Sequence, residues 1–166
     1  MKVHQPETRL RSLWGRIDAQ HNELIRQRIR GRRVLDLGCG YGALTDHLAR
    51  AGFEVEGWDN DPASLEQARR LFPGAPILGH DLLEAVAGRE KSFDTIVMKD
   101  SFHHIVGEGD PVLAFAAVRA LLADSGRLVV LDPNLTPFLR LARWLIRHQD
   151  EEAPIALARS LLREEW

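Results

Sequence analysis

The stretch RVLDLGCGYG, residues 33–42, decides how the chain folds, because a short apolar run is followed there by an acid and by three glycines spaced two residues apart. The run RVLDL has the length and composition of a strand buried in a parallel sheet. Glycines directly after such a strand are typical of a turn that passes close to a nucleotide. Asp36 stands just before the first glycine, where its carboxylate would repel a phosphate. The stretch thus predicts a nucleotide site and raises the question of which nucleotide suits it.

Five strand-like runs alternate with helical patterns along the chain. Short apolar runs predict strands at residues 33–37, 53–59, 77–81, 93–100 and 127–132. Helices are predicted at residues 7–30 (one helix or a pair), 42–50, 62–71, 82–86, 110–122 and 136–148, with Asp61 as an N-cap. A strand that returns to a parallel neighbour through a helix crosses over in essentially one hand. The alternation therefore predicts an α/β fold, an open, doubly wound and mainly parallel sheet with helices on both faces and ligands at the carboxyl ends of the strands.

Composition limits the class of protein. With 166 residues, of which 45% are hydrophobic and 28% charged, the chain fits one globular domain. The N-terminus is polar and no apolar run approaches the roughly 20 residues that cross a bilayer, so a cytoplasmic protein is expected. Cys39 is the single cysteine, which excludes an internal disulfide and argues against a structural metal site. The net charge of −2 gives no overall attraction to nucleic acid.

The glycines alone fit two kinds of nucleotide. Residues 38–43, GCGYGA, match a dinucleotide-binding fingerprint, and Asp59 follows at the distance of its ribose-binding acid, so an NAD(P)-dependent oxidoreductase is one reading. A carboxylate at Asp36 would oppose a pyrophosphate by about 1 kcal/mol or more at intermediate dielectric. A ligand with a cationic amine at that place would gain from the same carboxylate. The charge therefore favours a nucleoside that carries a cation.

The stretch VLDLGCGYG resembles the first motif of the class I S-adenosylmethionine-dependent methyltransferases. The resemblance continues through GWDND, GHDLLE, FDTIVMKDSFHHI and LLADSGRLVVLDPN, and covers residues 33–134 in the expected order. It implies a Rossmann-like sheet with strand order 3-2-1-4-5, S-adenosylmethionine as the cofactor and S-adenosylhomocysteine as its product. Members of this family usually end in an antiparallel strand pair, and no strand is predicted here after Asn134. We expect that this hairpin is missing.

The resemblance also implies roles for individual residues. Gly38 and Gly40 would pass under the cofactor, with Asp36 holding its methionine end. Asp59 would accept the two ribose hydroxyls, because a carboxylate has two oxygens for a vicinal diol. The alternative for Asp36 is to cap the following turn, and the alternative for Asp59 is to cap the helix that begins near Pro62. Further positions in these motifs are expected to bind the cofactor, namely Asp81 at the adenine amino group, Leu82 on the ring, and Cys39, Gly42, Asn60 and Lys99.

Three residues after the fourth strand are candidates for catalysis. By the resemblance, Asp100 falls beside the donor methyl group and the acceptor. His103 or His104 is a candidate general base, needed only for an acceptor whose proton must leave near neutral pH. Neighbouring residues rarely point the same way, so at most one of the two histidines is expected to face the site. A structural role for them, and for Asp81 as a helix cap, stays the alternative.

The methyl acceptor is expected to be a small molecule methylated on oxygen, nitrogen or carbon. The basic segment before Val34 lacks interleaved aromatic residues, so nucleic acid is not expected, and this segment is predicted to be a lid. The arginines of residues 136–148 leave a peripheral membrane or lipid contact open, and an exposed fifth strand leaves a homodimer open. A catalytically silent S-adenosylmethionine-binding domain is a third reading. The expected organisation is a helical cap at 1–31, a cofactor-binding core at 32–134 and C-terminal helices at 135–166.

Overall fold

The computed structural model describes residues 6–107 and 110–132, all of which belong to one unit, Met1–Asp132. The helices predicted after Asn134 and the missing hairpin lie outside these residues. The single domain over residues 1–166 therefore stays a prediction. Within the described part of the chain, no helix combines the length and apolar character that a membrane crossing requires.

The core of the fold is a parallel sheet of five strands in the order β3-β2-β1-β4-β5. The strands are β1 (Arg33–Leu37), β2 (Glu54–Asp59), β3 (Ile77–Gly79), β4 (Phe93–Lys99) and β5 (Leu122–Leu131). This confirms the predicted fold class and strand order. The order reverses between β1 and β4, and at such a switch point the crossover helices leave in opposite directions and open a crevice at the carboxyl ends of the strands.

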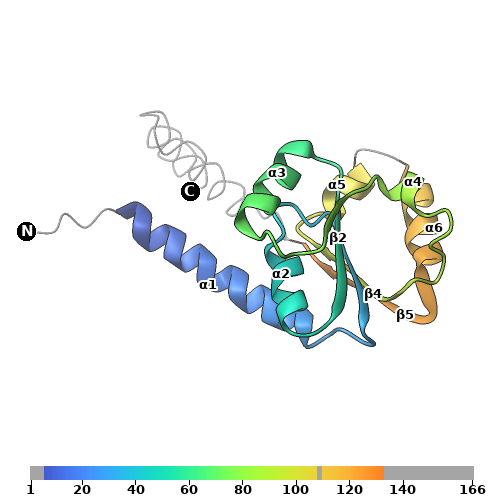
Figure 1. Ribbon diagram of the computed structural model, residues 1–166, viewed down its shortest axis with the longest axis horizontal. Coiled ribbons are helices and arrows are strands. Elements are labelled where there is room, and N and C mark those ends of the chain that lie inside the picture. Colours follow the sequence, from blue (N-terminus) through green and yellow to red (C-terminus); the bar gives the residue numbers. More distant parts are fainter. Residues whose placement is uncertain (1–5, 108–109, 133–166) are drawn as a thin grey trace, which may run out of the picture. The chain divides into compact units, whose positions relative to one another are not determined.

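Helices cover both faces of the sheet (Figure 1). They are α1 (Pro6–Arg26), α2 (Ala43–Arg50), α3 (Pro62–Leu71), α4 (Leu82–Ala85), α5 (Phe102–Gly107) and α6 (Pro111–Leu121). Three aspartates begin helices by accepting hydrogen bonds from backbone N–H groups of the first turn: Asp61 at α3, Asp81 at α4 and Asp110 at α6. A carboxylate at this position also meets the positive end of the helix dipole. Proline follows two of these caps, at Pro62 and Pro111, where its missing N–H costs nothing.

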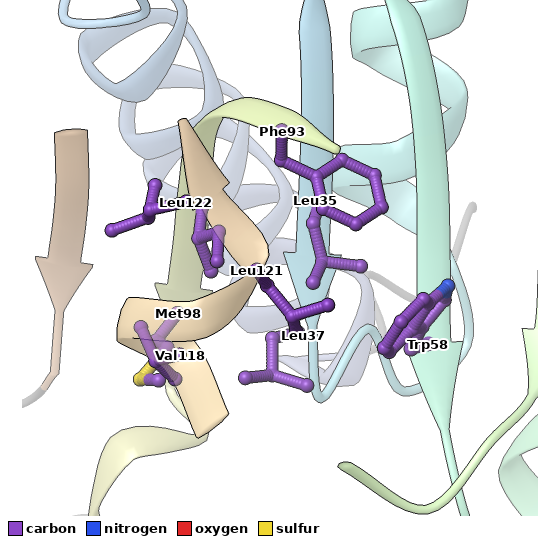
Figure 2. Close-up of a cluster of buried hydrophobic side chains, with 9 residues drawn as sticks. Leu35, Leu37, Trp58, Phe93, Met98, Val118, Leu121 and Leu122 are labelled. Carbon is purple, nitrogen blue, oxygen red and sulfur yellow. The ribbon is translucent and has the colours of Figure 1, made fainter. Parts of the chain in front are cut away.

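Two apolar layers hold the helices on the sheet. Leu35 and Leu37 point to one side of β1, where they pack with Trp58, Met98 and residues of α6 (Figure 2). Val34 points to the opposite side. There it meets the second layer, which contains Ile25 of α1, Leu44 and Leu48 of α2, and Val55, Val97 and Val129 of the sheet. The nearly unbroken apolar run of β1 is thus explained by burial on both faces.

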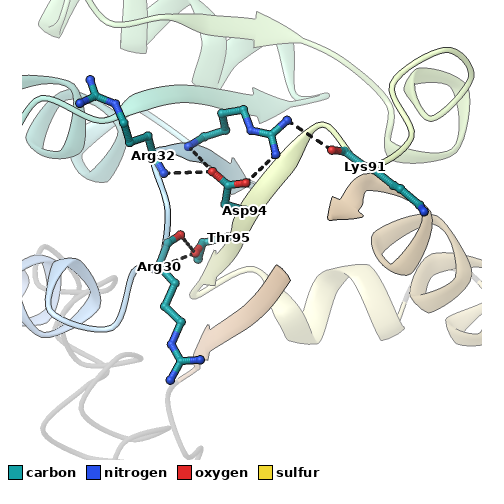
Figure 3. Close-up of polar contacts among 6 residues, drawn as sticks. Arg30, Arg32, Lys91, Asp94 and Thr95 are labelled. Atoms are coloured by element: carbon teal, nitrogen blue, oxygen red, sulfur yellow. Dashed lines mark hydrogen bonds and ion pairs between the residues drawn. The ribbon is translucent and has the colours of Figure 1, made fainter. Parts of the chain in front are cut away.

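The loop between α1 and β1 is attached to β4 by polar contacts (Figure 3). The backbone N–H groups of Arg32 and Arg33 both donate to Asp94 Oδ2 at 3.0 Å, and the Arg33 guanidinium donates to Asp94 Oδ1 at 2.5 Å. The Arg33 guanidinium and these N–H groups lower the pKa of Asp94 to about 2. Thr95 adds a bond from its Oγ1 to the carbonyl oxygen of Arg30 at 2.7 Å. Part of the arginine-rich stretch before Val34 therefore serves to attach this loop to β4.

Two local features differ from the sequence predictions. Residues 102–107 form α5, which was not predicted, because a six-residue helix is too short for a periodic pattern. The carboxylate that accepts from the His103 N–H, Asp132, comes from a distant part of the chain, directly after β5. Strand β5 also begins at Leu122, earlier than the strand predicted at residues 127–132. Leu122 pairs with Phe93 and Arg127 with Thr95, so the DSG residues form an irregularity within the strand. The buried Leu122 holds the strand start in the core.

Candidate active site

A cavity of about 690 Å³ lies at the carboxyl ends of the strands. Its lining comes from the segments that follow β1, β2, β3 and β4, and from α6. The lining residues are Leu37, Gly38, Gly40, Trp58, Asp59, Asn60, Asp61, Ser64, His80, Asp81, Leu82, Leu83, Asp100, Ser101, His104, Asp110 and Ala114. Four of the lining residues are aspartates that end a strand or follow it within two residues: Asp59, Asp61, Asp81 and Asp100. Asp110 adds a further carboxylate. None of these described lining residues is a lysine or an arginine. The cavity is therefore suited to a neutral or cationic ligand.

The glycine loop folds tightly at the floor of this cavity. The N–H groups of Gly38 and Cys39 both donate to the carbonyl oxygen of Trp58, at 2.8 and 3.0 Å. Gly38 has φ +74°, and a Cβ there would overlap the side chain of Ser101. A Cβ at Gly40, also at positive φ, would instead meet open space. The loop thus leaves room directly above Gly40, where a ligand can approach the backbone.

Gly38 lies where the structure has no room for a side chain. We expect Gly38→Ala to lower the free energy of unfolding by about 3 kcal/mol, because the methyl group needs a left-handed backbone and displaces Ser101. Gly74→Ala is the matched control, since a Cβ at Gly74 meets nothing within 4 Å. Urea denaturation of both variants measures the difference. Equal stability of the two variants would contradict the packing described for the loop.

Asp59 joins the end of β2 to the glycine loop. Its Oδ2 accepts from the N–H of Gly40 at 2.7 Å, and its Oδ1 accepts from the N–H of Asp61 at 2.9 Å. Each carboxylate oxygen has a second lone pair, so both can still accept from a ligand in the cavity. Asn60 lines the same side. Asp61 caps α3, as predicted, and Asp59 lines the cavity, where ligand binding by its carboxylate stays a prediction.

Asp36 is buried beneath the loop and does not line the cavity. Its Oδ2 accepts from the Thr45 hydroxyl at 2.7 Å. Burial raises the pKa of Asp36 to about 6, although the Thr45 hydrogen bond and the charge of Lys99 act in the opposite direction. Cys39 and Gly42 also lie outside the lining, and burial raises the pKa of the Cys39 thiol above its usual range. Gly42 is the residue before the first turn of α2.

Lys99 is bound to α1 rather than exposed in the cavity. Its ammonium group donates to Asp18 and, at 2.7 Å, to Asn22, and its side chain is 9% exposed. The sequence placed Lys99 among the cofactor-binding residues. The structure gives it two partners on α1 and puts it outside the described lining. Lys99 thereby attaches the second half of α1 to the carboxyl end of β4.

On the side of the cavity formed after β3, Asp81 and Leu82 are brought together with His80. Asp81 also caps α4, accepting from the N–H of Leu83 at 2.9 Å, so the capping role and a place in the lining are both real. The His80 ring meets the buried Trp58 ring edge-on, with centroids 5.1 Å apart. Sequence reasoning missed His80 and Trp58, although both stand next to aspartates that it selected.

The two histidines lie on α5 with their ring centroids 4.2 Å apart, but they have different surroundings. His104 lines the cavity with Asp100, whereas His103 is held by Asp132 and lies outside the lining. His103 donates through its backbone N–H to Asp132 Oδ2 at 2.8 Å, and its Nδ1 lies 2.7 Å from Asp132 Oδ1. Ser101, which the sequence did not suggest, donates to the carbonyl oxygen of Leu37 at 2.7 Å. One of the two candidate histidines thus lines the cavity, and its role as a general base stays a prediction.

The switch-point cavity, the glycine loop and the aspartates at the strand ends are features of an α/β domain of the Rossmann-like class. Residues 35–128 match the methyltransferase-domain family, and the chain belongs to this family. The sequence resemblance is thereby confirmed at the level of the family, while the roles of single residues stay predictions.

Individual relatives agree with this assignment. The chain is 32% identical over 116 residues to a ubiquinone biosynthesis O-methyltransferase of Xanthomonas euvesicatoria, covering 68% of this chain and 47% of the relative. It is 35% identical over 103 residues to the same type of enzyme from Paracidovorax citrulli, covering 59% and 42%. The chain thus spans less than half the length of these relatives. A TehB-like SAM-dependent methyltransferase of Corynebacterium glutamicum superposes with a TM-score of 0.57 at 25% identity, covering 83% of this chain and 81% of that one.

Proposed function

We propose that the chain binds S-adenosylmethionine and transfers its methyl group to a small-molecule acceptor. The observation that carries the proposal is the charge of the cavity, whose described lining residues include several aspartates and no lysine or arginine. A pyrophosphate would be repelled by this lining, whereas a ligand with an ammonium and a sulfonium group would be attracted. The charge therefore argues against the oxidoreductase alternative.

The residues present fit this cofactor. The open space above Gly40 admits a ligand close to the loop, and the free lone pairs of Asp59 suit a ribose diol. Asp81 and Leu82 offer an acceptor and an apolar surface to an adenine ring beside α4. When bound, the cofactor supplies an electrophilic methyl group. The ammonium end would lie toward Asp36, which acts from below the loop.

The acceptor would enter beside Asp100, Ser101 and His104, which line the cavity after β4. These residues orient the acceptor and hold it at attack distance, which can supply several kcal/mol of the rate enhancement. For an acceptor hydroxyl or amine whose proton must leave, the His104 imidazole would take the proton. The names of the relatives support both chemistries, since one group methylates oxygen and a sugar N-methyltransferase of Streptoalloteichus superposes at 29% identity and TM-score 0.51.

The segment 1–31 is proposed to cap the site. Lys99 supports this role, because its bonds to Asp18 and Asn22 attach α1 to the strand end next to Asp100. The core at 32–134 would then hold both ligands.

The proposal is tested in two steps with the full 166-residue chain. Titration calorimetry should show uptake of S-adenosylhomocysteine and none of NADH; the reverse result would establish the oxidoreductase alternative. Release of S-adenosylhomocysteine is then followed with a panel of phenolic, sugar and amine acceptors. Binding without turnover on the whole panel would favour a silent cofactor-binding domain.

A further inference from the structure

Trp58 forms part of the floor of the cavity although its side chain is fully buried. It stands on β2 at the margin of the core cluster that also contains Leu35 and Leu37 (Figure 2). Its ring supports the ring of His80, which lines the cavity directly before Asp81. The place of the Trp58 ring therefore affects the shape of the cavity on the side where we place the nucleoside.

Two charged residues hold the Trp58 ring from outside the cavity. Trp58 Nε1 donates to Glu56 Oε2 at 3.0 Å, and Glu56 Oε1 pairs with the Arg89 guanidinium at 2.6 Å. Glu56 and Trp58 are two residues apart on β2, so their side chains share a face. The guanidinium carbon of Arg89 lies 5.2 Å from the Trp58 ring centroid and 5.5 Å from that of Phe93, within cation–π range. Each of the three side chains of Glu56, Trp58 and Arg89 thus contacts the other two.

Arg89 belongs to a different surface from the cavity. It lines a separate hollow of about 450 Å³, together with Arg33, Glu54, Phe93 and others. Its side chain is about one third exposed, as is that of Glu56. Neither residue lines the cavity, so neither can contact a ligand bound there. Among the described contacts of the pair, those with Trp58 and with the end of α4 lead toward the cavity lining.

Arg89 also reaches the short helix α4. Its backbone N–H donates to the carbonyl oxygen of Val86 at 3.0 Å, directly after α4 ends. A helix of four residues has no stability of its own, so its position depends on tertiary contacts. Leu82 and Val86 pack on the core cluster that contains Trp58. The link from Arg89 to Trp58 therefore ties the end of α4 to the floor of the cavity.

We propose that Glu56 and Arg89 are positioning residues for the nucleoside half of the ligand. They hold the Trp58 ring and the end of α4, and these in turn place His80, Asp81 and Leu82. The inference rests on the proposed binding of S-adenosylmethionine, and it assigns a binding role to an ion pair that touches no ligand. The affinity for the nucleoside half then depends on this ion pair, whereas the binding of the methionine half does not.

The test measures binding of S-adenosylhomocysteine and of 5′-methylthioadenosine, which retains the nucleoside and lacks the amino acid. Arg89→Met should weaken both by the same factor, about tenfold, the scale of coupling between contacting residues. Glu56→Gln keeps an acceptor for Trp58 Nε1 and removes the charge, so a loss of about threefold is expected. Arg32→Met is the matched control, because it removes the exposed pair with Glu54 at the same end of the sheet.

A double-mutant cycle separates positioning from a general loss of folding. Trp58→Phe keeps a ring and removes the N–H, so combining it with Glu56→Ala should cost less than the sum of the two single losses, because both remove the hydrogen bond between Trp58 and Glu56. Unchanged affinity in both Arg89→Met and Glu56→Gln would overturn the inference, as would a loss seen with S-adenosylhomocysteine but not with 5′-methylthioadenosine. Failure of the wild-type chain to bind either probe would instead overturn the proposed function.

Discussion

Asp36→Asn is expected to raise the free energy of unfolding by about 2 kcal/mol at pH 8. Burial raises the pKa of Asp36 to about 6 from a usual value of 3.8. Because a tenfold change in a protonation equilibrium corresponds to about 1.4 kcal/mol, the buried charge costs about 3 kcal/mol above pH 6. Asparagine keeps an acceptor for Thr45, and its unpaired amide N–H offsets about 1 kcal/mol of the gain. Urea denaturation at pH 4, 6 and 8 measures the effect.

The pH window follows from the direction in which the pKa of Asp36 moves. Because the folded-state pKa lies above the unfolded one, the charge costs nothing below about pH 4; the cost grows between pH 4 and about pH 6 and is constant above that. The advantage of Asp36→Asn should therefore disappear at pH 4. Asp94 does not change stability in this pH range. Its pKa is lowered to about 2, so its contribution to the free energy of unfolding is lost only below pH 4. A pH-independent gain would show that burial of charge is not the cause.

Thr45→Val is the companion variant for Asp36. It removes the hydroxyl that donates to Asp36 Oδ2 and should lower stability at pH 8 by about 2 kcal/mol, the scale of a hydrogen bond to a charged group. The two variants therefore change stability in opposite directions. Asp36→Asn should also weaken S-adenosylhomocysteine binding by about 1 kcal/mol, if the carboxylate acts on the ligand ammonium through the loop. Unchanged binding would leave Asp36 a structural role only.

Asp59→Ala is expected to weaken S-adenosylhomocysteine binding by about 2 kcal/mol or more. The substitution removes the acceptors proposed for two ribose hydroxyls and, because Asp59 also accepts from the N–H of Gly40, it releases the glycine loop. Calorimetry gives the affinity of the variant. Asp124→Ala is the control, as Asp124 is an exposed aspartate paired with Lys91 and is not among the cavity-lining residues. Unchanged affinity in Asp59→Ala would remove Asp59 from the site.

Asp59→Asn separates the two roles of this residue. Asparagine retains one acceptor oxygen, so it can hold Gly40 or a hydroxyl, but it loses the second acceptor and the charge. An affinity between those of wild type and Asp59→Ala is expected. If Asp59→Asn matched Asp59→Ala, the charge rather than the number of acceptors would be the main contribution.

Much of the candidate site could be predicted because it is local in sequence. Gly38, Gly40, Asp59, Asn60, Asp81 and Leu82 all follow strands that the apolar pattern marks, and all line the cavity. Lys99 and His103 were selected for the same reason and lie elsewhere. Their partners, Asp18 and Asp132, are 81 and 29 residues away in the chain. A pairing of this kind has no local pattern, because it depends on how separate elements pack.

The sequence shows the charge of Asp36 but not the burial of its side chain. From the sequence, its carboxylate is an anion beside a nucleotide loop, which predicted a cationic ligand. In the folded chain it is buried on Thr45 with Lys99 as a charged neighbour, and the acidic surface toward the ligand consists of Asp59, Asp81 and Asp100 among others. The family is confirmed, and the charge that favours a cationic ligand is now seen to come from several strand ends together.

By itself the sequence determined the parallel sheet, its glycine loop and the family, since strand periodicity, glycine conformation and helix caps act over a few residues. Only the tertiary structure decided which side chains meet. It turned His104 toward the cavity and His103 toward Asp132, bound Lys99 to α1, and placed Glu56 and Arg89 behind Trp58. These contacts join residues from separate elements, and the orientation of each side chain is set by burial and by the nearest partner of opposite charge.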